Sequence, residues 1–354
     1  MGSRQPRLYA DLSKPRTHWS LIVELPQDGM RLDRFMVMRV RWRSRNQLQA
    51  MITEGLVAVN GRVRRKSSIR LKDQDRVVIE IPPEDDVIDP GEIPIEVLRD
   101  DGQLIAINKR PGIVVHPTSG HMLTNVLSAL HARFRDTANP ANDRVPHICH
   151  RIDKETSGVL LFAFSERWKA HVSLQFEART VKKEYLAIVE GRLDRDEGSI
   201  EAPILHRTEG WPRLVVREEG LPSRTDWRVE QDFGGAQLVR FFPRTGRTHQ
   251  IRVHAAHIGH PLLADDTYGG RRPAFVSELR GRRTADRDPD EPSILDRVAL
   301  HSTRLELVHP TTGELYVVEA PLPADLQHAV DALSGAALGG AATARTIAPE
   351  EEAS

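Results

Sequence analysis

The chain of 354 residues has little of several features that define common protein classes. It contains one cysteine, Cys149, which excludes an internal disulfide and a cysteine-rich zinc site. It lacks an apolar run of membrane-spanning length, and its N-terminus lacks the apolar core of a signal peptide. Pro6 stands where a myristoylation motif needs Ser or Thr. We therefore expect a soluble, cytoplasmic protein.

The chain also lacks a net charge, because 50 lysines and arginines balance 50 aspartates and glutamates. The distribution is nevertheless uneven. Residues 31–76 carry 13 basic and 4 acidic side chains, a net of +9, whereas residues 84–101 carry 8 acidic side chains against Arg99, a net of −7. A basic module of this kind is typical of proteins that bind a polyanion.

Hydropathy and turn residues divide the chain into segments. The first residues are polar and show no apolar period, and the last are rich in alanine and glycine, so we expect both ends to be disordered. The expected segments are a flexible arm at 1–19, the basic module at 20–82, an acidic and proline-containing linker at 83–95, a larger domain at 96–333 with a surface insertion at 271–297, and a disordered tail at 334–354.

The basic module shows the pattern of two short helices followed by a small sheet. Apolar residues between Leu32 and Met36 lie at helical spacing, and Ser44 can cap a second helix that ends at Gly55. Asn60-Gly61 predicts the turn of a hairpin, and residues 76–81 have the composition of a closing strand. These elements predict a small α/β domain.

The larger domain shows more strand than helix patterns. Strands are predicted at 104–108, 158–164, 184–189, 236–242, 303–308 and 314–320, and helices at 123–134, 166–178, 248–258 and 324–333. Strands with few helices between them are typical of an antiparallel arrangement. The sequence therefore predicts an α+β domain built on a mainly antiparallel mixed sheet.

Cationic residues in the basic module cluster before the second helix and after the predicted turn. The candidates for phosphate contacts are Arg43, Arg45, Arg62, Arg64, Arg65 and Lys66. A charge run is more often a solvated face, but a net of +9 on so small a scaffold favours RNA binding. The segments Arg31-Leu-Asp-Arg-Phe35 and Ser44 to Gly61 resemble the S4 RNA-binding domain, named after a small-subunit ribosomal protein.

In the larger domain, the run His150-Arg-Ile-Asp-Lys-Glu-Thr-Ser-Gly158 has the composition of a catalytic loop. It resembles the signature of the RluA/RluC/RluD family of pseudouridine synthases, with Ile152 where the family has Leu. Three further segments agree in order, and we interpret the four together as a strong resemblance. They are Asn108 to Pro117, Val181-Lys-Lys-Glu-Tyr-Leu-Ala-Ile-Val-Glu-Gly191, and Arg244-Thr-Gly-Arg-Thr-His-Gln-Ile-Arg-Val-His254 with Gly259-His-Pro-Leu262 behind it.

The resemblance implies a role for each matching residue. Asp153 would attack the sugar or act as a base, and an arginine paired with it would favour its ionised form. Arg247 is the expected ion-pair partner, and Tyr185 is expected to stack on the flipped uracil, although a core tyrosine is the plain alternative. Arg151 would enter the gap left by the flipped nucleotide. His249 and Arg252 are further candidates for RNA contacts, and the family uses no cofactor.

Other interpretations are weaker. The histidines 249, 254, 257 and 260 invite a metal-dependent hydrolase, but they lack a His-Glu-x-x-His motif, and a kinase loop would need a glycine-rich loop and an Asp-Phe-Gly motif. A non-catalytic RNA-binding factor for ribosome assembly remains the alternative from another class. We expect a metal-free, monomeric RNA pseudouridine synthase acting on large-subunit ribosomal RNA or a pre-ribosomal particle, away from membranes.

Overall fold

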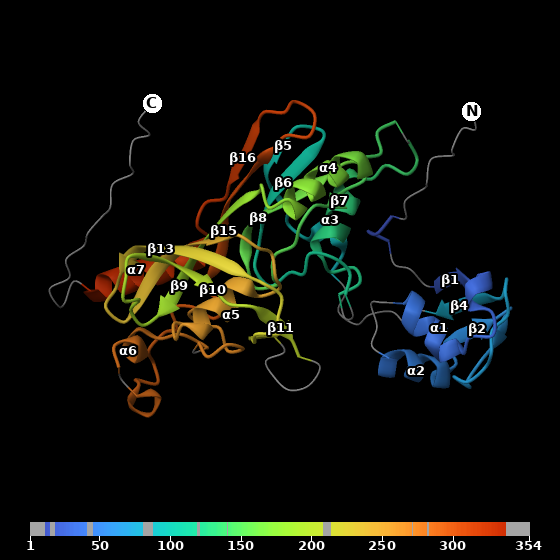
Figure 1. The fold of residues 1–354 in the computed structure, drawn as a ribbon, viewed down its shortest axis with the longest axis horizontal. Helices are drawn as coiled ribbons and strands as arrows, with labels where there is room; N and C mark the ends of the chain where they lie inside the picture. Colours follow the sequence, from blue (N-terminus) through green and yellow to red (C-terminus); the bar gives the residue numbers. More distant parts are fainter. Residues whose placement is uncertain are drawn as a thin grey trace. The chain divides into compact units, whose positions relative to one another are not determined.

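The computed structural model describes residues 11–14, 18–40, 45–80, 88–118, 121–139, 141–207, 214–270, 272–281 and 283–337. The chain forms two compact units (Figure 1), one from Met1–Pro94 with Val114–Pro146 and one from Ile95–Ile113 with His147–Ser354. Residues 114–146 therefore group with the N-terminal residues rather than with the rest of the segment expected at 96–333. Among the described helices, none is long and apolar enough to cross a membrane.

The N-terminal unit packs two helices against a small antiparallel sheet. Its elements are β1 (His18–Ile22), α1 (Leu32–Arg39), α2 (Arg45–Glu54), β2 (Val57–Val59), β3 (Arg62–Val63) and β4 (Arg76–Glu80), with strand order β1-β4-β2-β3. The predicted turn is confirmed, since Asn60 (φ 51°) and Gly61 (φ 76°) connect β2 to β3. The expected arm was two residues too long, because β1 pairs with β4 from His18 and Trp19 packs on the core.

The same unit contains one more helix. Helix α3 (Val126–Phe134) begins at Asn125, whose side chain accepts a hydrogen bond from the backbone N–H of Ser128 at 2.9 Å. This cap explains why the helix starts three residues later than the apolar pattern predicted. The 3-10 helices η1 (Leu25–Gln27) and η2 (Pro90–Glu92) complete the regular elements of this unit.

Within the described residues of the larger unit, ten strands form one sheet. Along the main path its order is β10-β13-β14-β9-β15-β8-β6-β5, with β16 beside β15 and β7 beside β8. The strands are β5 (Glu96–Asp100), β6 (Leu104–Lys109), β7 (His147–Ile148), β8 (Ser157–Ala163), β9 (Lys182–Glu190), β10 (Glu197–Glu201), β13 (Arg224–Asp232), β14 (Ala236–Pro243), β15 (Leu300–Val308) and β16 (Leu315–Glu319). β8 pairs with β15 in parallel and the other described pairs are antiparallel, which confirms the predicted fold class.

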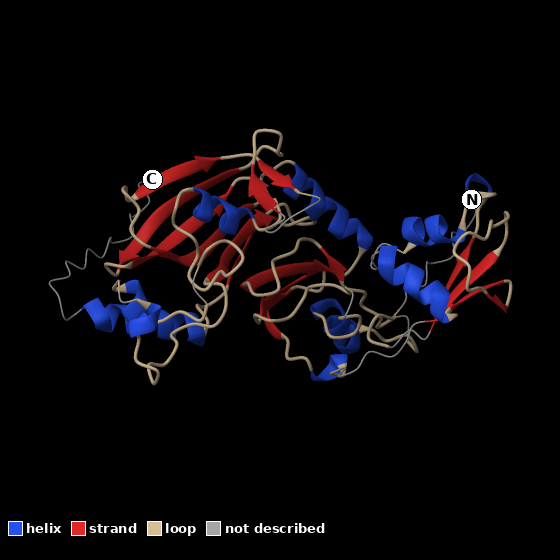
Figure 2. Cartoon of the chain, turned by 90° about the horizontal axis from the view of Figure 1, so that it is seen from below, coloured by secondary structure: helices blue, strands red, loops and turns tan. Residues whose placement is uncertain are grey.

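Helices cover both faces of this sheet (Figures 1 and 2). Helix α5 (Gln250–His257) packs on strands β13 and β14, and α4 (Glu166–Glu177) packs on β8 and β15. Both helices lie on the face of the sheet that carries Tyr185. For α5, Tyr185 packs against the cluster that includes Ile251 of this helix. For α4, Leu305 of its cluster lies opposite Lys183, which is on the same face of β9 as Tyr185. Helix α7 (Ala324–Ala337) belongs to a separate cluster with Ile188, on the opposite face.

The segment expected as a surface insertion at 271–297 is attached to the core near both of its ends. A bridge joins Ala274 to Leu295, and both side chains are buried in the same cluster as α7. Helix α6 (Val276–Leu279) and η3 (Thr284–Asp286) lie between them. A short sheet of β11 (Ile204–His206) and β12 (Leu214–Val216) is the remaining regular element. Apolar residues at the ends of the insertion therefore contribute to the core.

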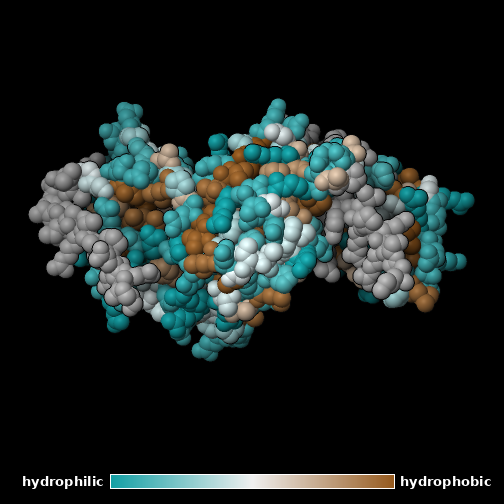
Figure 3. Space-filling model, turned by 90° about the horizontal axis from the view of Figure 1, so that it is seen from above, coloured by the Kyte–Doolittle hydropathy of each residue, from teal (hydrophilic) through white to brown (hydrophobic). Residues whose placement is uncertain are grey.

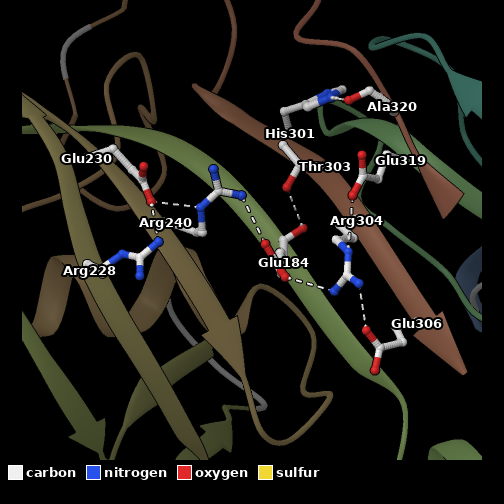
Figure 4. Close-up of polar contacts among 10 residues, drawn as sticks. All are labelled: Glu184, Arg228, Glu230, Arg240, His301, Thr303, Arg304, Glu306, Glu319 and Ala320. Atoms are coloured by element: carbon white, nitrogen blue, oxygen red, sulfur yellow. Dashed lines mark hydrogen bonds and ion pairs between the residues drawn. The ribbon is translucent and has the colours of Figure 1, made fainter. Parts of the chain in front are cut away.

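A chain of ion pairs crosses five strands on the face opposite Tyr185 (Figure 4). Glu184 of β9 accepts hydrogen bonds from Arg240 of β14 at 3.0 Å and from Arg304 of β15 at 3.1 Å. Arg240 also donates to Glu230 of β13, and Arg304 to Glu319 of β16. Because each arginine joins neighbouring strands, a shift of one residue in register would separate the charges.

Hydrophilic residues cover much of the surface seen in Figure 3, with hydrophobic residues in patches between them. Large apolar side chains that are exposed in the larger unit include Leu174, Leu221 and Leu315. They come from separate elements, as is usual for a folded domain.

Gly158 allows β8 and β15 to approach each other. Its φ is 105°, and a Cβ built there would overlap the backbone oxygen of Ser302. We expect Gly158→Ala to lower the free energy of unfolding by about 3 kcal/mol or more, because it adds a clash to backbone strain. Gly313→Ala is the control, since Gly313 has φ 72° but open space around it, and should cost only about 1 kcal/mol. Equal urea-unfolding midpoints for the two variants would contradict this account.

Candidate active site

The loop between β7 and β8 carries Asp153, and its start is held by His150. His150 Nε2 accepts a hydrogen bond from the backbone N–H of Leu161 at 3.1 Å, and the imidazole stacks on Phe176 with 5.2 Å between ring centres. Burial lowers the pKa of His150 to about 3, and the charge of Lys183 adds to this effect. The imidazole is therefore neutral and can accept this bond.

Two buried cations hold the backbone just after Asp153. Lys109 donates to the carbonyls of Arg110, Ile113 and Lys154 at 2.8, 3.0 and 2.9 Å, so all three of its N–H groups are used. Burial lowers the pKa of Lys109 to about 7, although the charges of Glu155 and Asp153 oppose this shift.

Arg297 donates to the carbonyl of Glu155 at 3.1 Å. Its other donors bind both carboxylate oxygens of Asp325 in α7, at 2.6 and 2.9 Å. Together with Lys109, this arginine fixes two successive carbonyls next to the carboxylate.

Strand pairing brings β9, which carries Tyr185, close to the start of β8. Ser302 of β15 lies opposite Gly158 of β8 on one side and opposite Tyr185 of β9 on the other. Burial raises the pKa of Tyr185 to about 12, a hydrogen bond to Ser302 opposes the rise, and the negative charge of Asp153 adds to it. The phenol is thus protonated at neutral pH and can offer its ring to a ligand.

Arg252 of α5 connects Asp153 to a buried carboxylate. Its Nε and Nη2 donate to the two oxygens of Asp265 at 2.7 and 2.8 Å, and its Nη1 lies 3.6 Å from Asp153 Oδ2. Asp265 is fully buried, whereas the Asp153 side chain is 25% exposed. Burial alone would lower the pKa of Arg252, but the bonds to Asp265 raise it overall. The guanidinium is therefore a fixed positive charge beside Asp153.

His249 approaches the same carboxylate from the start of α5. Its backbone is left-handed (φ 53°), its Nδ1 is 2.9 Å from the hydroxyl of Tyr268, and its Nε2 is 4.0 Å from Asp153 Oδ2. Burial lowers the pKa of His249, and Arg252 adds to the lowering although Asp153 opposes it. A neutral imidazole therefore borders the carboxylate at neutral pH.

The ion pair expected between Asp153 and Arg247 is wrong for this structure. Among the described residues, the basic side chains within 4.0 Å of Asp153 are those of Arg252, which is charged, and His249, which is neutral. Arg247 instead donates from Nη2 to the carbonyl of Pro222 at 3.4 Å. The reason is local: Gln250 holds the backbone N–H of Arg247 at 3.0 Å, and α5 begins only at Gln250, so Arg252 projects from the helix toward the loop.

The remaining predicted residues lie apart from this cluster or outside the description. Arg151 is exposed, and Arg43 lies outside the described residues. In the N-terminal unit, Arg45, Arg62 and Lys66 are exposed and Arg64 is half-buried. Arg65 has a structural contact, because it donates to the carbonyl of Thr53 at 2.8 Å at the end of α2. Their contacts with RNA stay predictions.

Asp265 and Tyr268 escaped the sequence reasoning. The available signal was a carboxylate directly after the apolar run Leu262-Leu-Ala264, thirteen residues beyond Arg252. His254 of α5 has a structural role: it is fully buried, and its two ring nitrogens lie 2.9 Å from Thr225 Oγ1 and from the carbonyl oxygen of Ala202. Within the described part of the chain, no three His, Cys, Asp or Glu side chains are arranged to hold a metal ion.

The arrangement places a fixed guanidinium and a neutral imidazole beside a partly exposed carboxylate. Such a carboxylate can attack an electrophilic carbon or remove a proton while its charge is balanced. The fold and the site are those of an α+β protein with one partly exposed carboxylate beside a fixed positive charge.

Comparisons with known proteins agree. The model of the RNA pseudouridylate synthase family matches residues 103–257, and that of the S4 domain matches residues 30–77. The chain is 36% identical over 317 residues to ribosomal large subunit pseudouridine synthase D of Nitrosomonas europaea, covering 86% of this chain and 85% of the relative. It is 35% identical over 309 residues to an uncharacterized RNA pseudouridine synthase of Aquifex aeolicus, covering 86% and 94%.

A solved structure, human RNA pseudouridylate synthase domain containing 4, shares the fold with a TM-score of 0.51. It is 24% identical and covers 67% of this chain and 92% of its own. The chain belongs to the RNA pseudouridine synthase family, with an S4 domain near its N-terminus. It is an isomerase that acts on RNA.

We expect Arg252→Lys to lower kcat about 100-fold, because lysine cannot bind Asp265 with two parallel bonds and also face Asp153. Arg240→Lys is the matched control, since Arg240 also bridges two carboxylates but on the opposite face of the sheet. Arg252→Lys should lose more stability because Asp265 is fully buried, so kcat is compared at a temperature where thermal unfolding shows both variants folded. An unchanged kcat in Arg252→Lys, or an equal loss in Arg240→Lys, would contradict the assigned position.

Proposed function

We propose that the enzyme converts specific uridines of large-subunit ribosomal RNA into pseudouridine, with Asp153 as the catalytic carboxylate. The observation that carries the proposal is that Arg252 and His249, from one motif, lie beside Asp153 of a motif about a hundred residues earlier. The substrate class rests on the relatives named ribosomal large subunit pseudouridine synthase D, such as that of Nitrosomonas europaea.

The reaction breaks the bond from N1 of uracil to C1′ of the ribose and joins C5 to the same carbon. N1 gains a proton and C5 loses one, so the balance needs no oxidant, metal or cofactor. Asp153 either attacks C1′ or removes a proton from the sugar, and in both roles the positive charge of Arg252 lies beside the reacting carboxylate. Tyr185 stacks on the flipped uracil. Base–aromatic stacking of this kind stabilises the flipped base by about 1–3 kcal/mol.

Further residues assist in holding the RNA. Arg151, exposed and two residues before Asp153, enters the space that the flipped nucleotide leaves. His249 contributes a neutral ring at the edge of the site. The module at 20–82 binds RNA phosphates through Arg45, Arg62, Arg64, Arg65 and Lys66, together with Arg43, which lies outside the described residues.

We infer that the catalytic domain follows a linker at 83–95 and is formed by residues 96–113 and 147–333, since residues 114–146 group with the N-terminal unit. The enzyme acts as a cytoplasmic monomer during the maturation of ribosomal RNA. It needs no bound metal, because the isomerisation requires only a carboxylate and a flipped base.

The test is release of tritium from ribosomal RNA labelled at C5 of uridine, because that hydrogen is lost when C5 joins C1′. Wild-type protein should release tritium, and Asp153→Asn should reduce the rate at least about 10³-fold. Binding of the same RNA, measured by filter retention, should stay within about twofold. Absence of release by wild type would contradict the proposal, and full activity of Asp153→Asn would remove the assigned carboxylate.

A further inference from the structure

A basic pocket of about 310 Å³ lies next to the candidate site in the larger unit. It is formed by the end of α4, the start of β9 and the segment before α5. Its lining residues are Phe176, Glu177, Arg179, Val181, Lys183, Arg244, Thr245, Gly246 and Arg247. Four are cationic and one, Glu177, carries a negative charge, so the pocket favours an anion.

The cationic side chains of this pocket have N–H donors that are not used within the described structure. Lys183 Nζ donates to the carbonyl of Thr245 at 3.1 Å, and an ammonium group has two further N–H donors. Burial lowers the pKa of Lys183 to about 8, and the charge of Arg179 adds to this effect. A bound anion would relieve the cost of burying this charge.

Arg247 and Arg244 form the other wall. Arg247 Nε is buried and lacks a hydrogen-bond partner among the described residues, while its Nη2 makes one long bond to the carbonyl of Pro222. Arg244 is partly neutralised, since its Nε donates to Asp226 at 2.7 Å. An unpaired buried N–H is rare in native structures, and the pocket is where a ligand could accept its bond.

The pocket adjoins the residues around Asp153 on both sides. Lys183 precedes Tyr185 by two residues, so the two side chains lie on the same face of β9, about 7 Å apart along the strand. Arg247 precedes His249 by two residues in the opposite wall. A nucleotide whose base reached Tyr185 would therefore have a backbone phosphate within reach of the pocket.

We propose that this pocket binds a backbone phosphate of the substrate RNA next to the flipped uridine. The inference rests on the proposed function and adds a site to it. Lysine and arginine side chains that face a common space suit the several acceptor oxygens of a phosphodiester. Arg247, which the sequence placed against Asp153, thereby acts on substrate binding instead.

The experiment measures the affinity of wild type, Lys183→Gln and Arg247→Gln for a large-subunit ribosomal RNA transcript over a series of KCl concentrations. Each loss of a phosphate contact should weaken binding about tenfold. It should also reduce the slope of log Kd against log salt by about 0.7–0.9. In tritium release, the loss should fall on KM rather than on kcat.

Arg195→Gln is the matched control, because Arg195 is exposed beyond the far end of β9 and its slope should equal that of wild type. Arg247→Lys keeps the charge and should restore most of the slope, which a merely structural loss would not do. Wild-type slopes in both pocket variants, or an effect on kcat alone, would overturn the proposal. Failure of wild type to release tritium would instead count against the proposed function, since the binding measurement needs no turnover.

Discussion

The site depends on a guanidinium held between two carboxylates. Arg252 is bound through two nitrogens to buried Asp265, which leaves Nη1 facing Asp153 at 3.6 Å. Breaking such a buried pair by removing one partner typically costs about 3–5 kcal/mol. The positive charge beside Asp153 is therefore fixed before substrate arrives.

The rest of the larger unit holds the two sides of this contact in place. Lys109 and Arg297 bind the carbonyls that follow Asp153, while Gly158 lets β15 approach β8 and so brings β9 with Tyr185 beside the loop. On the opposite face, the ion pairs of Glu184 fix the register of β9 with both neighbours. Strand β9 thus carries the structural charge of Glu184 on one face and Tyr185 on the other.

The sequence predicted most strands of the sheet and the loop that carries Asp153, because apolar periodicity and local motifs are short-range signals. It missed β13, whose buried residues alternate with Asp226 and Arg228 and therefore look polar. It also chose Arg247 over Arg252, since both lie in one motif and only the start of α5 at Gln250 decides which arginine faces the loop. Asp265 was missed, because an aspartate after an apolar run reveals its role only through the tertiary contact with Arg252.

The proposed activity of this chain is the formation of pseudouridine in large-subunit ribosomal RNA through Asp153. Its most direct test is to map pseudouridines in ribosomal RNA from cells that lack the gene, complemented with wild type or with Asp153→Asn. One or more large-subunit positions should lose pseudouridine and regain it only with wild type. Identical maps in all strains, or recovery with Asp153→Asn, would contradict the account.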